Sequence, residues 1–273
     1  MKLSVIMSNY NGAHYIKEAI DSVVGQDYQP FEFLVIDDGS TDHSRDVIDA
    51  ACDRYADRVS THYVNRNQGQ GSSFNYGINH IDGEVVCFID SDDFWLPGKL
   101  QSVAKAFTDK PNAVIYQHNL LLLKNGQITD QKFREILVEG NYYEHSISSR
   151  LLPQFVPTTG LSIKVDCLKK ILPIPDVFRV CADGYITRTS MCWGEVTSSY
   201  EAFGVYRVHE SNNTYGNNTF NEKRYLKNLL YPALNKYYVD HDLELRYGNE
   251  TLLEKILDTS LKKILREYLD MSV

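Results

Sequence analysis

The sequence predicts an α/β fold with a mostly parallel central sheet and a C-terminal helical extension. Short apolar runs alternate along the first part of the chain with segments whose apolar residues recur every three to four positions. This is the pattern of strands followed by helices. Clusters of polar residues stand where these runs end. Because ligands of open α/β sheets bind at the carboxyl ends of the strands, the same pattern predicts a binding site there.

Four strands are expected in the first half of the chain, at residues 3–7, 31–36, 59–64 and 85–89. Helices are expected between them, at residues 16–24, 47–51 and 72–81. Ser40 or Thr41 is expected to cap the second of these helices, because a hydroxyl side chain can bind the free amides of a first turn.

The rhythm changes after residue 113. The expected elements are a strand at 113–123, a hairpin turn at 125–126, an irregular segment at 140–157, a strand at 160–164, helices at 167–171 and 183–192, and a strand at 199–208. We therefore expect a first domain at residues 1–215 and a helical extension at 216–273. Apolar residues from Leu252 to Leu269 form a stripe at helical spacing. Such a stripe is more typical of a core or an oligomer contact than of a membrane anchor, and a homodimer or a peripheral membrane contact through it both stay open.

Composition excludes some classes of protein. The chain has 273 residues, of which 43% are hydrophobic and 23% charged, as in ordinary globular proteins. A net charge of −8 argues against nonspecific binding of nucleic acid, which needs a cationic surface. The five cysteines are scattered and form no CxxC pair, and no apolar segment suits a signal peptide or a membrane span. These features predict a soluble protein of the cytoplasm, with no nucleic-acid partner.

The most informative stretch is a buried strand that ends in carboxylates. Five apolar residues at 85–89 are followed by Asp90, Asp92 and Asp93. Crowded carboxylates repel one another, and a divalent cation such as Mg²⁺ or Mn²⁺ makes the crowding tolerable while also binding substrate phosphates. The alternative is an acidic turn before the helix that is expected to begin near Pro97, with Asp93 as its cap.

Several nucleotide-binding motifs are absent. The turn after the first strand, residues 8–12, lacks the GxGxxG pattern of a dinucleotide site, and no P-loop is present. The phosphoaspartate phosphatases place Asp-x-Asp-x-Thr/Val after an apolar strand, but Phe94 occupies the position of the small or branched residue. A phosphatase is therefore disfavoured.

Seven short motifs follow one another along the first hundred residues, at 4–12 (SVIMSNYNG), 35–42 (VIDDGSTD), 67–69 (NQG), 75–77 (NYG), 83–84 (GE), 88–93 (FIDSDD) and 95–100 (WLPGKL). With these motifs in this order, the chain resembles, over roughly its first 210 residues, the family 2 glycosyltransferases of the GT-A fold. One departure concerns Phe74, which stands where many relatives carry an arginine that clamps the diphosphate.

The resemblance implies transfer of a sugar from a nucleotide diphosphate with inversion at the anomeric carbon. Ser8 and Tyr10 match positions that contact the base and ribose, although Tyr10 could instead be a packing aromatic. Asp38 matches the acid that accepts a hydrogen bond from a base imide, which favours uracil or thymine. Gln70 is a candidate neutral contact for the diphosphate, and Asp90 and Ser91 are expected on the donor side as well.

The resemblance also implies a metal and a base. Asp92 is expected to bind Mn²⁺ or Mg²⁺, with Asp90 and His209 beside it. Asp183, followed by Arg188, matches the general base, for which Asp166 and Asp176 are weaker candidates. The alternative for Asp183 is a helix cap, and a histidine such as His209 is often structural.

The expected function is therefore a metal-dependent inverting transferase that uses a nucleotide-diphospho-sugar, UDP or dTDP favoured. Its acceptor is expected to be a glycan or a lipid-linked sugar in cell-surface polysaccharide or glycolipid synthesis, at the inner face of the membrane. Acceptor specificity is expected in the loops at 140–157 and 211–221. The alternatives are a catalytically degenerate nucleotide-sugar-binding protein and a scaffold that binds partners through the Leu252–Leu269 stripe.

Overall fold

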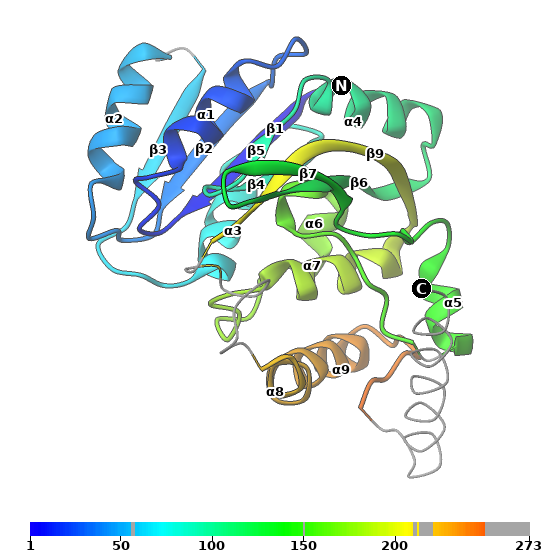
Figure 1. Cartoon of the computed structure of the whole chain (residues 1–273). Coiled ribbons are helices and arrows are strands. Elements are labelled where there is room, and N and C mark those ends of the chain that lie inside the picture. The colour runs from blue at the N-terminus through cyan, green and yellow to red at the C-terminus, as the bar shows by residue number, and fades with distance from the viewer. Residues whose placement is uncertain (56–57, 150, 210–211, 213–220, 249–273) are drawn as a thin grey trace.

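The computed structural model describes residues 1–55, 58–149, 151–209, 212 and 221–248. Within them the chain forms a nine-stranded mixed sheet of order β3-β2-β1-β4-β8-β6-β9-β5, with β7 paired to β6. Helices cover both faces of this sheet (Figure 1). The expected α/β class is confirmed.

The four N-terminal strands form the parallel part of the sheet. They are β1 (Leu3–Asn9), β2 (Glu32–Asp37), β3 (Val59–Tyr63) and β4 (Val85–Asp90). Strand β1 lies between β2 and β4, and β2 also pairs with β3. All three pairings are parallel. Strands buried on both faces read as continuous apolar runs, which explains why they stand out in the sequence.

The second half of the sheet is mostly antiparallel. It contains β5 (Phe94–Trp95), β6 (Ala113–Lys124), β7 (Gln127–Lys132), β8 (Leu161–Lys164) and β9 (Glu195–Val208). Strand β8 runs antiparallel to both β4 and β6, whereas β6 and β9 are parallel. The acidic turn at residues 90–93 leads into the two-residue β5. This strand pairs with β9, so the chain rejoins the sheet directly after the turn.

The helices are α1 (Ile16–Val24), α2 (Ser44–Arg54), α3 (Gln70–Asn79), α4 (Lys99–Asp109), α5 (Tyr142–Ser149), α6 (Val165–Ile171), α7 (Ala182–Ser190), α8 (Glu222–Tyr225) and α9 (Tyr231–Asp240). Short 3₁₀ turns at Thr158–Gly160 and Met191–Trp193 and a π turn at Leu226–Leu230 join some of them. No helix among the described residues is long and apolar enough to cross a membrane.

Two expectations about helices are wrong. Helix α5 lies in the segment that was expected to be irregular. Neither Ser40 nor Thr41 caps α2, which begins at Ser44 after His43. The Ser40 hydroxyl donates to Asp37 at 2.6 Å instead, so that the turn after β2 folds back on the strand end rather than onto the helix.

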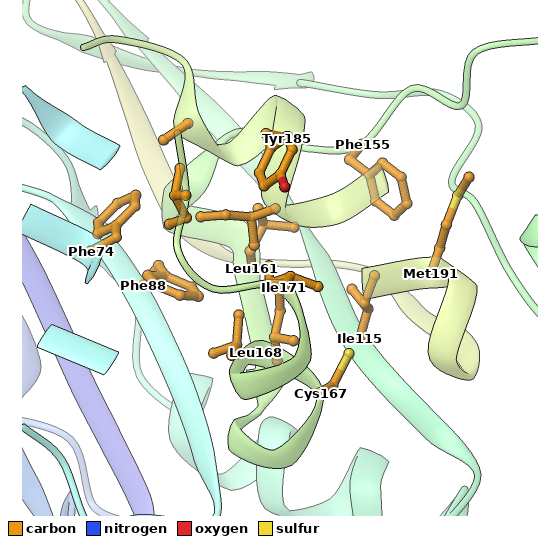
Figure 2. Close-up of a cluster of buried hydrophobic side chains, with 14 of the residues drawn as sticks. Phe74, Phe88, Ile115, Phe155, Leu161, Cys167, Leu168, Ile171, Tyr185 and Met191 are labelled. Atoms are coloured by element: carbon orange, nitrogen blue, oxygen red, sulfur yellow. The ribbon is translucent and has the colours of Figure 1, made fainter. Parts of the chain in front are cut away.

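Two hydrophobic clusters lie on opposite faces of the sheet, because alternate residues of each strand point to opposite sides. In β4, for example, Val86 and Phe88 belong to the first cluster and Cys87 and Ile89 to the second. The first cluster joins α3, α6, α7 and α9, and Figure 2 shows part of it, in which Phe74 lies beside Phe88 with ring centroids 4.9 Å apart. The second joins α1, α2 and α4.

The C-terminal part of the described chain packs on the first cluster through α9, whose Leu234 and Tyr238 are fully buried. The predicted boundary between residues 215 and 216 and the Leu252–Leu269 stripe lie outside the described residues.

Candidate active site

A cavity of about 910 Å³ opens at the carboxyl ends of β1, β2 and β4. All nine residues predicted for the site line it, although they come from six separate stretches of the chain. They are Ser8, Tyr10, Asp38, Gln70, Asp90, Ser91, Asp92, Asp183 and His209. The structure thus brings together every residue of the predicted site, while the role of each remains a proposal.

The two acids after β2 serve different purposes. Asp37 is fully buried and accepts hydrogen bonds from Asn9 Nδ2 at 2.8 Å and from Arg45 Nε at 3.1 Å, so it holds the fold. Asp38 lines the cavity, and its two carboxylate oxygens accept the backbone amides of Gln68 at 2.8 Å and Gly69 at 2.6 Å. Asp38 therefore also fixes the loop before α3, a role that the sequence does not reveal.

The residues after β1 form the rim of the cavity. Tyr10 is 49% exposed, so the alternative in which it packs in the core is wrong. Gly12 lies against Ser91, and an added Cβ there would approach the Ser91 hydroxyl oxygen to 2.9 Å. This close approach lets the loop after β1 and the acidic turn after β4 share one wall.

In the acidic turn, Asp93 faces away from the helix that it was expected to cap. Its carboxylate accepts a hydrogen bond from Thr159 Oγ1 at 2.5 Å and another from the amide of Arg207 at 2.9 Å. Helix α4 begins at Lys99, with Gly98 at its N-cap position. The capping role is therefore wrong, and Asp93 instead ties the turn to the second half of the sheet.

Asp90 is the last residue of β4, and two other acids, Asp92 and Asp183, lie near its side chain. Burial raises its pKa well above the ordinary value, and the negative charges of Asp92 and Asp183 add to this rise. One carboxylate oxygen accepts Gln70 Nε2 at 3.1 Å. A group of acids held in this way attracts a cation.

Asp92 and His209 form a pair that suits a divalent metal. Asp92 Oδ2 lies 3.0 Å from His209 Nε2, and the His209 ring stacks on Tyr15 with centroids 4.8 Å apart. A carboxylate with an imidazole is a donor set that Mn²⁺ accepts. Among the described residues no group of three or more His, Cys, Asp or Glu side chains forms a complete metal site. Diphosphate oxygens and water would have to supply the other ligands, as is usual for Mg²⁺ and Mn²⁺.

Asp183 is the second residue of α7 and is the only one of the three candidate bases that lines the cavity, since Asp166 and Asp176 are exposed elsewhere. Cys181, not Asp183, holds the N-cap position of this helix. Burial raises the pKa of Asp183, whereas the positive charge of Arg188 opposes the rise.

Gln70 connects the two ends of the site. Its amide nitrogen donates to Asp90, as described above, and its amide oxygen accepts the backbone N–H of Ala182 at 3.0 Å. Gln70 therefore couples the last residue of β4 to the first turn of α7. Both of its polar atoms are engaged by protein, which leaves only its second amide hydrogen for the predicted contact with a diphosphate.

Sequence reasoning missed several residues of the cavity wall. They include Arg134, Phe155, Thr158, Arg179 and Tyr225. None belongs to a motif, and their contacts link segments far apart in sequence. Arg179 could have been suspected from the departure at Phe74, because its guanidinium lies on the donor side and donates to the carbonyls of Asn67 and Gln68 at 3.2 Å each.

Comparisons with known proteins point to one family of enzymes. The model of the family described as "Glycosyl transferase family 2" matches residues 4–168. An uncharacterised glycosyltransferase of Nostoc sp. is 36% identical over 219 residues, which are 78% of this chain and 66% of the relative. A Bacillus subtilis protein, provisionally named a teichuronic acid biosynthesis glycosyltransferase, is 29% identical over 47% of this chain and 51% of its own length.

Among solved structures, S. aureus TarS 1-349 in complex with UDP-GlcNAc has a TM-score of 0.67 at 21% identity, covering 88% of this chain and 66% of that chain. The mannosyltransferase PcManGT from Pyrobaculum calidifontis, in complex with GDP-Man and Mn²⁺, has a TM-score of 0.59 at 18% identity, covering 77% and 58%. At these identities the likeness shows a shared fold.

Proposed function

Because the chain belongs to glycosyltransferase family 2 and has the GT-A fold, we propose that it transfers a sugar from a nucleotide-diphospho-sugar to a hydroxyl acceptor with inversion. The observation that carries the proposal is that all nine predicted residues line one cavity. The candidate base Asp183 lies close enough to Asp90 for their charges to interact.

The donor end fits a nucleotide diphosphate with uracil or thymine as its base. Ser8, Tyr10 and Asp38 line this end, where an exposed aromatic ring can stack on a base and a carboxylate can accept an imide N–H. TarS has been solved with UDP-GlcNAc, which supports a uridine nucleotide, whereas PcManGT has been solved with GDP-Man.

The proposed reaction is a single displacement. Asp183 accepts the proton of the acceptor hydroxyl as the acceptor oxygen bonds to the anomeric carbon, and the bond from that carbon to the diphosphate oxygen breaks. Asp92 and His209 would hold Mn²⁺ or Mg²⁺, which when bound supplies positive charge to the leaving diphosphate. Burial raises the pKa of Asp183, which strengthens it as a base, and the positive charge of Arg188 opposes this rise.

The acceptor end is lined by apolar and aromatic side chains, among them Phe133, Leu152, Phe155, Tyr206 and Tyr225. Such side chains pack against the faces of sugar rings, so a glycan or lipid-linked acceptor fits here. The name of the Bacillus relative supports a role in cell-surface polysaccharide synthesis. We place the reaction in the cytoplasm at the inner face of the membrane, which agrees with five free cysteines.

The test is thermal stabilisation by UDP, dTDP, GDP and ADP, each with and without Mn²⁺. A ligand that binds only the folded state raises the melting temperature by mass action. We expect UDP or dTDP to raise the melting temperature only when Mn²⁺ is present. We expect Asp92→Asn to abolish this Mn²⁺-dependent rise. Absence of a shift with every nucleotide would contradict the proposal.

A catalytically degenerate binding protein would pass the same test, so turnover separates the two functions. The proposed transferase releases free nucleotide from its donor, at least by slow hydrolysis. A degenerate protein would show the stabilisation without any release over hours.

A further inference from the structure

Two arginines line the cavity near the proposed base, and neither forms an ion pair with a described carboxylate. Arg134 follows β7 and Arg188 lies on α7, and both line the cavity close to Asp183. Within the described part of the chain neither guanidinium lies within 4.0 Å of a carboxylate oxygen, although ion pairs of that kind form elsewhere in the molecule. A cluster of positive charge therefore faces the place where the sugars would react.

Arg188 is only 9% exposed, and its charge is unusual for such a buried position. One terminal nitrogen donates to Gly184 O at 3.0 Å and to Thr187 Oγ1 at 3.3 Å, and the other donates to Pro153 O at 2.7 Å. Its Nε is buried and has no partner among the described residues. Burying an unpaired charge costs free energy. Arg188 is therefore kept at this position either because its charge binds an anion from a ligand or because the fold requires its hydrogen bonds.

Arg134 is less buried and is better placed to meet a ligand. Its Nε donates to Phe155 O at 3.2 Å, and that is the single hydrogen bond that its guanidinium makes to described residues. Burial lowers the pKa of Arg134, and the positive charge of Arg188 lowers it further. Two cations that repel each other in a partly dry cavity are stabilised by a negative group between them.

The acids nearby do not remove this need. Asp183 lies close enough to interact with both arginines, but it is the proposed base. When it accepts the acceptor proton it loses its negative charge, and the arginines are then left uncompensated. Glu222 also lines the cavity, but it is exposed to solvent and forms no ion pair with Arg134 or Arg188.

We propose that Arg134 and Arg188 bind an anionic group, a carboxylate or a phosphate, carried by one of the two sugars that react. The group belongs either to the acceptor or to the transferred sugar, as in a hexuronic acid. A guanidinium can bind either group through two parallel hydrogen bonds. This inference rests on the proposed transferase function, because it takes the cavity as the place where both substrates meet.

A structural role is the competing explanation, because both arginines also hold the segment at 153–155 through its carbonyls. The two explanations differ in what Arg134→Gln changes. Loss of an anion site removes a preference for charged ligands, whereas loss of a structural contact lowers stability and weakens all ligands equally.

The experiment has two arms, each read by calorimetric titration in the presence of Mn²⁺. In the first arm, the affinities of UDP-glucuronate and UDP-glucose are compared. In the second arm, protein saturated with UDP is titrated with glucuronate and glycerol phosphate, and with glucose and glycerol as neutral counterparts. We expect at least about a tenfold preference for the anionic ligand in one arm, the worth of a charge-assisted pair. A preference in the first arm assigns the anion to the transferred sugar, and one in the second assigns it to the acceptor.

Three variants complete the test. Arg134→Gln should abolish the preference, Arg134→Lys should restore part of it, and Arg58→Gln is the control. Arg58 is exposed far from the cavity and donates to Gln29 Oε1, so the control makes the same change in net charge.

Affinity for UDP alone should stay within about twofold in all three variants, which reports separately on the proposed function. Equal affinity for anionic and neutral ligands in both arms, or equal loss in Arg134→Gln and Arg58→Gln, would overturn the inference.

Discussion

Asp38 and Asp93 show how single carboxylates at the strand ends hold the fold together. Both belong to motifs that the sequence displays, but only Asp38 lines the cavity. Their partners could not be predicted, because the amides of Gln68 and Arg207 lie 30 and 114 residues away. A motif indicates which residues matter, but only the fold shows what each of them contacts.

For Asp183→Asn we expect turnover to fall by about a hundredfold to ten-thousandfold, which is the usual contribution of a general base. The amide has nearly the same shape but cannot accept the proton. Affinity for the donor nucleotide should change by less than about twofold, since Asp183 is not among the residues proposed to contact the donor. Steady-state rates and nucleotide titration measure the two effects.

Asp166→Asn is the matched control, because Asp166 is exposed on α6 and lies outside the cavity. It should leave both quantities unchanged. Full activity of Asp183→Asn would remove this residue from the reaction.

Lys99 is a fully buried cation outside the cavity, and it gives stability a specific pH dependence. Its ammonium donates to Ser162 Oγ at 3.1 Å and lies over the rings of Trp95 and Tyr116. Burial lowers its pKa from 10.5 to about 8. Between these two pH values the unfolded state binds more protons than the folded state, so the contribution of Lys99 to the free energy of unfolding rises with pH.

We therefore expect the advantage of Lys99→Met over the wild type in free energy of unfolding to be largest at pH 8 and below. It should narrow by on the order of 3 kcal/mol as the pH rises from 8 towards 10.5. Urea unfolding at several pH values measures this difference, and taking the difference removes the titration of other groups. A gap that is constant with pH would show that the Lys99 ammonium is not destabilised by burial.

At the scale of elements, the loop before α3 and the segment before α7 form one unit. Gln70 N donates to Arg179 O and Gly71 N to Phe178 O, each at 2.9 Å, so the segment caps the first turn of α3. Gly69 has a φ of +100°, and a Cβ at this position would overlap the backbone of Arg179. The glycine is needed here for its conformation and also for space.

Gly69→Ala should lower the free energy of unfolding by about 3 kcal/mol, because backbone strain adds to the steric overlap. It should also weaken nucleotide binding, since the loop borders the donor end. Gly126→Ala is the matched control, because Gly126 has a φ of +77° but nothing within 4 Å of an added Cβ. It should cost about 1 kcal/mol and leave nucleotide binding intact. Equal losses in both variants would refute the close packing between the two segments.

Most elements could be predicted from the sequence, because β1, β2 and β4 are continuous apolar runs and the helices between them have one apolar face. The orientation of β8 and the pairing of β5 could not. Both depend on partners far along the chain, and a short apolar run looks the same in either direction. Helix α5 was missed because Ser146 is its single buried residue, so it has no apolar stripe.

At the scale of the whole molecule, the described C-terminal helices and the sheet share one hydrophobic cluster. Leu234 and Tyr238 of α9 are fully buried there, and the Tyr238 hydroxyl donates to Arg188 O at 3.1 Å. Trp193 also donates to Tyr237 at 2.7 Å. The helix that carries the candidate base is therefore packed between the sheet and α9.

Leu234→Ala should lower the free energy of unfolding by about 2–5 kcal/mol, the range for a leucine deleted from a packed core. Val239→Ala on the same helix is the control, because Val239 is 57% exposed and should change it by less than about 0.5 kcal/mol. The two tryptophans report on different places, since Trp95 belongs to the second cluster and Trp193 packs on the first. In variants of Leu234→Ala that keep only Trp95 or only Trp193, the unfolding transition followed by the fluorescence of the remaining tryptophan should shift by the same amount. A shift confined to Trp193 would show that α9 unfolds separately.

The hydrogen bond from the Arg207 amide to Asp93 joins residues 114 positions apart, so it cannot form until both have been synthesised. At roughly 5–20 residues per second, a ribosome exposes the acidic turn about 6–23 seconds before the strand that holds it. During that interval the Asp93 carboxylate lacks the hydrogen bond from the Arg207 amide. The donor half of the cavity therefore matures only after translation has passed β9, and a nascent chain released before that point carries the motifs of the family without a finished site.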